Sequence, residues 1–358
     1  ANFQFLLFLT TVIKAVYEHS TELRVAIATA GNDHRLGANE APPAIISVFL
    51  GDLLSRVLHD LEKGVVTETK EKAWLSIGID KIPTIPRDNT DRNRTSPFAF
   101  TGNKFEFRAV GGNQTPSTAI TVLNSAVAAK LTETKEAIDA KMKSGADFNS
   151  AVVETIREMF KASKNILFEG DNYSKEWEKE AEKRGLPNLK ATPEALETIL
   201  KPSTIKLFES LGIYSKRELE SRYIINMSNY IKQIDIEARV GYNMAMNMYL
   251  PAAIRYSNEL LTNVQLIENV LGNDKAQTER KFAAEIVDLT AKLNNESEKL
   301  NAERLKAEDI IDMKKAGEVY KSLLLQLNIV RDIVDKLEDI IPHETWPAPK
   351  YREMLLGL

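Results

Sequence analysis

Three short clusters of charged and polar residues in the first third of the chain have side chains suited to chemistry. Residues 32–40 read NDHRLGANE, a glycine-containing loop that places Arg35 five residues before Glu40. Loops often carry binding and catalytic groups, but the same residues also suit a solvated loop with an Asx turn. Taken alone, the loop favours the second interpretation, and His34 is expected to be an exposed polar residue.

The second cluster, residues 92–97, reads RNRTSP and carries two arginines one residue apart. The planar, permanently charged guanidinium group donates paired hydrogen bonds to phosphate or carboxylate oxygens. Arg92 and Arg94 are therefore candidates for binding an anionic substrate, and an exposed basic turn is the equal alternative. The chain contains no GxxxxGKS/T sequence, so any nucleotide is held without a phosphate loop of that kind.

The third cluster is residues 104–108, KFEFR, in which charged and aromatic residues alternate. The period of a strand puts Lys104, Glu106 and Arg108 on one face and the two phenylalanines on the other. The charged face is either a solvated ion-pair surface or a site where Glu106 binds a hard cation such as Mg²⁺ or Mn²⁺. In the second case Lys104 and Arg108 would hold anionic groups of the substrate.

Composition excludes several other kinds of site. The 358 residues include 51 acidic and 47 basic side chains and no cysteine, with a formal net charge of -4. The lack of thiols excludes a disulfide framework, a thiolate metal site and a cysteine nucleophile, and four histidines argue against a histidine-rich metal cage. The charge balance argues against nucleic-acid binding. No apolar run reaches the roughly 18 residues of a membrane span, so we expect a cytoplasmic protein without membrane contact.

The elements that must position these clusters change in type along the chain. Glycine and proline are concentrated before residue 128, where short elements alternate. The expected elements there are a helix over 2–19, a strand over 23–28, a helix over 43–62 and a strand over 104–110. Further helices are expected over 117–143, 149–164 and 174–184.

The last third has few helix breakers and is expected to form long helical hairpins. Apolar residues recur there at three-four spacing in two stripes that resemble a coiled coil. Glu296 and Glu303 interrupt the first stripe, which favours an antiparallel pair inside one subunit over a free zipper. The stripes are Phe282, Ile286, Leu289, Leu293 and Leu300, and then Leu323, Leu327, Val330, Val334, Leu337 and Ile341.

The clusters belong to two longer motifs that are recognisable as a set. Residues 34–47 read HRLGANEAPPAIIS, and residues 93–108 read NRTSPFAFTGNKFEFR. Both resemble the C-terminal part of glutamine synthetase, closest to type III, and residues 346–353, WPAPKYRE, are similar to the type III tail. Fainter similarity to the common synthetase core continues to about residue 234, and the remaining helices resemble the type III extension.

The resemblance implies a fold and a reaction. The fold is α+β over residues 1–235, with an antiparallel sheet bearing the charged face, and an all-α extension of helical hairpins over residues 236–358. The reaction is that of an ATP-dependent ligase, in which the γ-carboxylate of glutamate attacks the terminal phosphate of ATP. Ammonia then displaces phosphate from γ-glutamyl phosphate. The family uses two divalent cations, Mg²⁺ or Mn²⁺, and forms large homo-oligomeric rings.

On the strand, the resemblance implies roles for all three charged residues. Glu106 resembles the family's ligand for the metal that bridges the nucleotide phosphates, and Arg108 resembles the arginine that holds the glutamate carboxylate. Lys104 stands where other types place an arginine and is expected to bind ATP. Ala99 stands where those types place a second arginine.

In the two loops, the resemblance implies further roles. Arg94 resembles the arginine that contacts the ATP phosphates, with Arg92 beside it. Arg35 resembles the arginine at the glutamate and the reacting phosphate. Glu40 resembles the loop glutamate that closes over the site, helps to deprotonate ammonium and shields the acyl phosphate from water. The spacing from Arg35 to Glu40 is one residue shorter than in the common bacterial type.

Two family elements have no match in this sequence: the glycine-rich nucleotide motif with its histidine, and the Glu-x-Glu carboxylates for the other metal. Both precede this segment in the family, so we expect a C-terminal portion that supplies part of an active site, with oligomer contacts from its helical pairs. Two alternatives are a non-catalytic helical assembly module and a related γ-glutamyl ligase that uses another amine.

Overall fold

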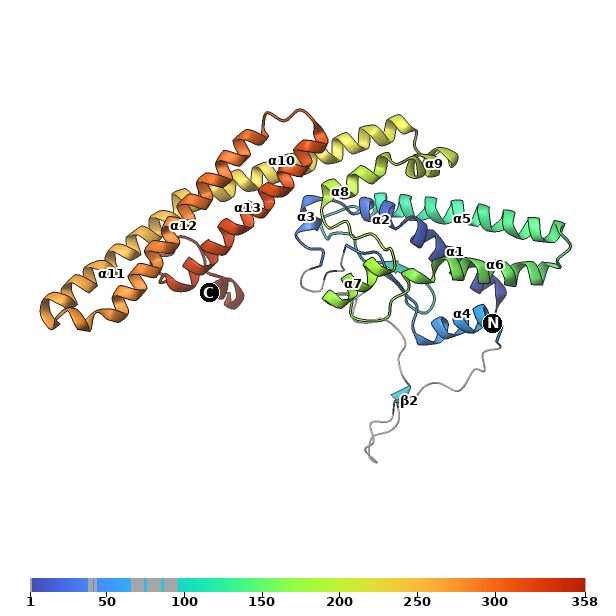
Figure 1. Ribbon diagram of the computed structural model, residues 1–358, viewed down its shortest axis with the longest axis horizontal. Helices are drawn as coiled ribbons and strands as arrows, with labels where there is room; N and C mark the ends of the chain where they lie inside the picture. The colour runs from blue at the N-terminus through green and yellow to red at the C-terminus, as the bar shows by residue number, and fades with distance from the viewer. Residues whose placement is uncertain are drawn as a thin grey trace. The chain divides into compact units, whose positions relative to one another are not determined.

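The computed structural model describes residues 2–37, 41, 44–65, 74–75, 85–86 and 96–357 (Figure 1). The chain forms two compact units, Ala1–Asn226 and Met227–Leu358, which are described separately. Helix α10 (Lys216–Met244) crosses the division between them. The boundary expected at residues 235 and 236 falls inside the same helix and stays a prediction.

Three long helices form the main core of the first unit. Helix α1 (Phe3–Glu18) packs against α5 (Ser117–Lys143) and α6 (Phe148–Ser163). The face of α1 that meets them is mainly apolar, with its residues at helical spacing, which is why this segment folds as a helix. All three helices are confirmed, with bounds within one residue of those expected. The buried apolar residues of α1 are Leu6, Leu9, Ile13, Ala15 and Val16.

A small sheet lies in the same unit, with strand order β1-β4-β5. Its strands are β1 (Val48–Phe49), β4 (Phe98–Phe100) and β5 (Phe105–Phe107). β4 and β5 are antiparallel, but β1 runs parallel to β4, so the expected antiparallel sheet is corrected to a mixed one. The physical reason is the connection: a short turn reverses the chain between β4 and β5, whereas a long crossover leads from β1 to β4.

That crossover contains helix α4 (Asp52–Lys63) and a two-stranded antiparallel sheet. The helix expected over 43–62 is wrong in its first part, because residues 44–50 include β1 and α4 begins only at Asp52. Buried β-branched residues such as Ile45 and Val48 favour extended backbone. Gly51, with φ of 84°, then supplies the turn into the helix. The two short strands are β2 (Trp74–Leu75) and β3 (Ile85–Pro86).

The strand expected over 23–28 is wrong, because residues 23–26 lie in helix α2 (Ser20–Ala26) and residues 27 and 28 follow it. Leu23 and Ile27 are four residues apart and both almost completely buried, which is the spacing of one helix face. Shorter helices complete the unit, and the one expected over 174–184 is confirmed as α7. They are α3 (Ala30–Asp33), η1 (Lys164–Ile166), α7 (Lys175–Lys183), α8 (Thr192–Leu196), η2 (Glu197–Leu200) and α9 (Pro202–Ser210).

The second unit consists of long helices. Consecutive helices contact one another, α11 with α12 and α12 with α13, and Figure 1 shows them running alongside each other as hairpins. The expected antiparallel pair in the last third is therefore confirmed. The elements are the π-helical turn η3 (Ala245–Tyr249), α11 (Leu250–Leu271), η4 (Asn273–Lys275), α12 (Gln277–Ala307), α13 (Met313–Ile340) and α14 (Tyr351–Leu356).

The buried stripe of α12 differs in detail from the expected one. Phe282 is 48% exposed, and the smaller Ala283 takes its place in the core. The stripe also contains Ser297 and Arg304, and the guanidinium of Arg304 bonds the Asp235 carboxylate at 3.0 Å. A buried cation needs such a partner, so Arg304 continues the seam where the Asp235 carboxylate faces it. Across the described ranges, no helix has the length and apolarity needed to span a membrane.

Candidate functional site

The charged face expected on β5 exists, and its residues bond to one another. The Glu106 carboxylate lies 3.0 Å from Lys104 Nζ through Oε1, and 3.2 Å from Nε and Nη2 of Arg108 through Oε2. The Thr101 hydroxyl also donates to Oε1, at 3.3 Å. Glu106 thus lies between two cations, as strand alternation predicts.

The opposite face of β5 holds the strand in place. The ring of Phe98, on β4, stacks on Phe105 with centroids 5.0 Å apart and lies 6.2 Å from Phe107. Phe98 is fully buried. Gly102, with φ of 99°, takes a backbone conformation that other residues rarely adopt and closes the turn between the two strands. Aromatic packing and this turn therefore fix the direction in which the charged face points.

The two cations keep Glu106 ionised. Hydrogen bonds from Lys104 first, and from Arg108 second, hold the pKa of the Glu106 carboxyl below its usual range. An ionised carboxylate is a suitable ligand for Mg²⁺ or Mn²⁺. However, no group of three or more His, Cys, Asp or Glu side chains is arranged to hold a metal ion within the described part of the chain. The described residues alone therefore do not complete a metal site.

Arg35 lies in the turn after α3, and its guanidinium makes two hydrogen bonds that fix its plane. Nε donates to Oδ1 of Asn32 at 3.0 Å, and Nη2 donates to the backbone carbonyl of Ala109 at 3.0 Å. Ala109 directly follows Arg108 at the end of β5. The structure thus brings the Arg35 loop to the strand that carries Arg108 and Glu106, although the two segments are far apart in sequence.

Three other residues named from the sequence, Glu40, Arg92 and Arg94, lie outside the described residues. Their expected roles in ammonium deprotonation and in ATP binding stay predictions. His34 is exposed, as expected. The sequence-based site is therefore visible in the structure through Arg35, Lys104, Glu106 and Arg108.

Sequence reasoning missed a buried ion pair that anchors the Arg35 loop from its other side. The Asp33 carboxylate accepts hydrogen bonds from Arg24 at 3.0 Å and from the backbone N–H and hydroxyl of Thr192 at 2.6 and 2.9 Å. Burial raises the pKa of the Asp33 carboxyl, and the charge of Arg24 offsets part of that rise. The only sequence signal was an arginine nine residues before an aspartate, which is a weak one.

Arg24 itself is among the most deeply buried side chains of the unit, with 1% exposure. Its Nε and Nη2 donate to the carbonyls of Leu189 and Lys190, at 2.7 and 3.1 Å. The guanidinium therefore joins α2, α3 and the segment before α8. This arrangement holds the backbone on which Arg35 stands.

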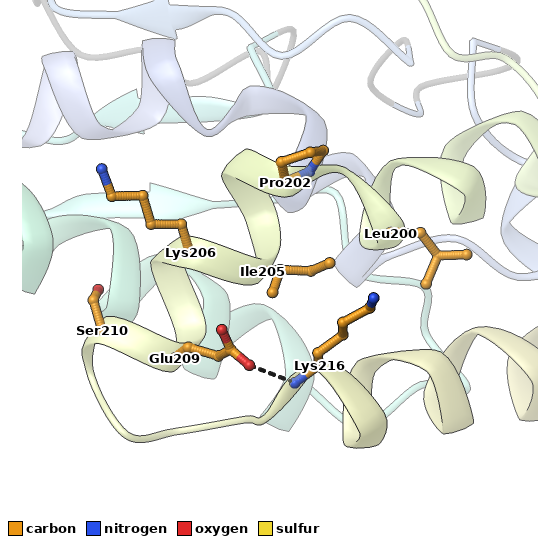
Figure 2. A pocket seen from close by; sticks show the side chains of 7 residues that line it. All are labelled: Leu200, Pro202, Ile205, Lys206, Glu209, Ser210 and Lys216. Atoms are coloured by element: carbon orange, nitrogen blue, oxygen red, sulfur yellow. Dashed lines mark hydrogen bonds between the residues drawn. The ribbon is translucent and has the colours of Figure 1, made fainter.

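An open hollow lies over α9 and the start of α10, in the same unit (Figure 2). The backbone N–H of Lys216 donates to Oε1 of Glu209 at 3.0 Å across it. Among the described site residues, Arg35, Lys104, Glu106 and Arg108 do not line this hollow, so it adds nothing to the chemistry described above. Its lining residues are Leu200, Pro202, Ile205, Lys206, Glu209, Ser210 and Lys216.

The known proteins to which this chain is similar all carry the name of one family. Residues 151–268 match the family model described as "Glutamine synthetase C-terminal domain". The chain is 37% identical over 368 residues to "Glutamine synthetase" of Bacteroides fragilis (strain YCH46), a match that covers 99% of this chain and 50% of the relative.

Two further relatives agree. The chain is 39% identical over 362 residues to "Type-3 glutamine synthetase" of Dictyostelium discoideum, covering 99% of this chain and 49% of that protein. It is 37% identical over 363 residues to "Glutamine synthetase" of Butyrivibrio fibrisolvens, covering 100% of this chain and 51% of that protein. The chain thus spans about half the length of the curated relatives that it matches.

Proposed function

We propose that this chain, which is similar to glutamine synthetases over nearly its whole length, supplies part of the active site of an ATP-dependent ligase that forms glutamine from glutamate and ammonia. The observation that carries the proposal is the similarity over nearly the whole chain to proteins of that name. The arrangement of the charged residues supports it, since every reactant except ammonia is an anion.

Arg35 and Arg108 are proposed to bind the anionic groups of glutamate and the phosphate being transferred. Both are guanidinium groups, which match carboxylate and phosphate oxygens with paired donors. The contact of Arg35 with the Ala109 carbonyl supports a shared role, because it ties one arginine to the backbone beside the other. Positive charge held in place before the reaction stabilises negative charge that develops during it.

Glu106 is proposed as one ligand of a divalent cation, with the remaining ligands supplied from outside the described residues. Such a cation neutralises charge on the phosphates of ATP. The chain's own contribution is a carboxylate that stays ionised between Lys104 and Arg108. The proposed cation is Mg²⁺ or Mn²⁺, both of which prefer oxygen ligands.

The roles proposed for Glu40, Arg92, Arg94 and Lys104 are those implied by the family. Arg92, Arg94 and Lys104 are proposed to bind ATP phosphates. Glu40 is proposed to cover the site and to help remove a proton from ammonium. We also propose that the enzyme is cytoplasmic.

The helices of the second unit are proposed to contribute contacts between subunits of a homo-oligomeric ring. The support is the set of large apolar side chains that α11 exposes, among them Leu266 at 59% and Val270 at 77%. Changing both residues to glutamate should reduce the particle size measured by light scattering. An unchanged assembly would contradict this role for α11.

A hybrid enzyme tests the proposed function. It joins this chain to the half of the Bacteroides fragilis relative that the chain does not match, and glutamine formation is measured as a function of ATP, ammonium and Mg²⁺. We expect activity that needs all three. Arg35→Ala should lower kcat/KM about a hundredfold, the usual cost of a lost charged donor at a reacting oxyanion. Glu106→Gln should raise the Mg²⁺ concentration needed for half-maximal activity.

The matched control is Arg217→Ala, which removes an exposed arginine at the start of α10 and should leave kcat/KM unchanged. A folded hybrid of the relative's size that makes no glutamine would contradict the proposed function. A normal Mg²⁺ dependence in the Glu106→Gln variant would remove Glu106 from the ligand set.

A further inference from the structure

Asn32, in α3, has a side-chain amide that links three segments of the chain. Its side chain is almost completely buried, with 2% of the residue exposed, and both ends of the amide are used. Nδ2 donates to the carbonyl of Ile27 at 2.8 Å and to that of Ala109 at 3.1 Å, while Oδ1 accepts from Nε of Arg35 at 3.0 Å. A buried amide with three partners has one fixed orientation.

The three partners of Asn32 belong to three different segments. Ile27 ends the α2 segment, Arg35 follows α3, and Ala109 follows β5. The carbonyl of Ala109 accepts from Asn32 and from Arg35 at the same time, which its two lone pairs allow. Asn32 and Arg35 therefore share one acceptor beside Arg108.

The backbone around Asn32 is held independently of its side chain. The Thr29 hydroxyl accepts from the backbone N–H of Asn32 at 3.2 Å and caps α3, and Gln114 donates to the same hydroxyl. On the other side, the next residue, Asp33, is bonded to Arg24 and Thr192. α3 is thus anchored without the amide, so the amide's bonds to Arg35 and Ala109 serve the arginine.

We propose that Asn32 is a positioning residue for Arg35, whose amide sets the plane of the Arg35 guanidinium against the end of β5. Asn32 itself touches no substrate. One side chain here accepts from Arg35 and donates to two carbonyls, and its bond to Arg35 needs only the acceptor oxygen. This inference rests on the proposed role of Arg35 in binding glutamate and the reacting phosphate.

The contact is tested on the full chain without any assay of activity. Phenylglyoxal modifies guanidinium groups, and peptide mass spectrometry gives a rate for each arginine. Losing a hydrogen bond to a charged group should raise the rate at Arg35 about tenfold in Asn32→Ala. The rate at Arg217 should not change. Asn32→Asp removes the donor to the Ile27 and Ala109 carbonyls but keeps an acceptor for Nε and adds a charge opposite to that of Arg35. In this variant Arg35 should therefore stay as protected as in the unchanged chain.

The control for general loosening is Thr204→Val, which removes a buried hydroxyl that donates to Glu22 and to the Thr198 carbonyl, outside this network. It should leave the rate at Arg35 unchanged. Equal rates at Arg35 in the unchanged chain and in Asn32→Ala would overturn the proposal. If Asn32→Ala fails to fold by circular dichroism, fast modification of Arg35 in a folded Asn32→Asp variant would overturn it.

The functional consequence is tested in the hybrid enzyme. Asn32→Ala should raise the KM for glutamate about tenfold, matching the loss of one well-placed charged bond, and leave the KM for ATP within about twofold. A residue that only stabilised the fold would lower the active fraction and leave both KM values unchanged. In an Arg35→Ala background, Asn32→Ala should add nothing further.

The outcomes separate this inference from the proposed function. A folded but inactive hybrid would overturn the proposed function, and this inference with it. An active hybrid that loses glutamate affinity in Arg35→Ala but not in Asn32→Ala would overturn this inference alone. Additive effects of the two substitutions would do the same, because they would show that Asn32 does not act through Arg35.

Discussion

The candidate site in the first unit and the long helices of the second unit are each stabilised by a different kind of contact. In the first unit, the residues around the candidate site are joined by hydrogen bonds between segments distant in sequence, such as Arg24 to Leu189 and Arg35 to Ala109. In the second unit, consecutive helices meet along a largely apolar seam. The difference teaches that directional polar bonds fix the positions of side chains around the candidate site, whereas periodic apolar contacts pack the long helices against one another.

The largest effect is expected from breaking the polar network at Arg24. Arg24→Met leaves the Asp33 carboxylate buried without its cation, which should destabilise the first unit by about 3–5 kcal/mol. Denaturant unfolding measures the loss, and hydrogen exchange should accelerate over residues 27–35 and 186–192. Arg217→Met, at an exposed arginine, should change stability by no more than about 0.5 kcal/mol. Exchange that accelerates equally in α12 and α13 would contradict the separate character of the two units.

A somewhat smaller effect is expected from a cavity in the apolar seam of the second unit. Leu293 is completely buried on α12, so Leu293→Ala should destabilise the second unit by about 2–4 kcal/mol through lost burial and a residual cavity. Leu305→Ala, on the same helix but 49% exposed, is the matched control and should cost less than about 1 kcal/mol. Similar losses for the two variants would show that the seam is not the main source of stability in these helices.

The smallest effect is expected from breaking an ion pair between two helices of the first unit. Lys130 on α5 bonds the carboxylate of Glu18 on α1. Burial raises the pKa of Glu18, but hydrogen bonds and charge from Lys130, aided by Lys14, outweigh it, so the pKa is lowered overall. A carboxyl with a lowered pKa in the folded state stabilises the protein above its unfolded pKa of about 4.5, and this stability is lost as pH falls through the folded value.

Lys130→Met should therefore cost about 1 kcal/mol at pH 7, and the difference from the unchanged chain should shrink as the pH is lowered from 5 toward 3. Thermal unfolding at a series of pH values measures this difference in stability. Lys135→Met, which breaks the exposed Lys135–Asp139 pair on the same helix, is the control and should change stability little at any pH. A constant difference across the acid range would show that Lys130 acts through packing and not through Glu18.

Elements with a clear local period could be predicted from the sequence. The apolar spacing in α1, α6 and α13, and the alternation of residues 104–108, arise from contacts of one element with one surface, so the pattern is visible in the residues themselves. The parallel pairing of β1 with β4 was not visible, because it depends on the path of the chain between them. The segment at Leu23 to Ala28 was misread because its apolar residues fit both periods.

At the candidate site too, only features that arise from a local sequence pattern could be predicted. Strand alternation was enough to place Glu106 between Lys104 and Arg108. No pattern could indicate that Arg35 bonds the carbonyl of Ala109, since every residue has such a carbonyl and only tertiary packing selects one. For the same reason Asn32 resembled an ordinary turn residue until the structure showed its partners.

The acceptor shared by Asn32 and Arg35 is part of the main chain, and this has an evolutionary consequence. A substitution at position 109 cannot delete a carbonyl, so mutation at this position is limited only by the space around a fully buried alanine. The donors, in contrast, are side chains that one nucleotide change can remove. Among descendants of this sequence, drift should therefore be tolerated at position 109 among small residues, while purifying selection falls on positions 32 and 35.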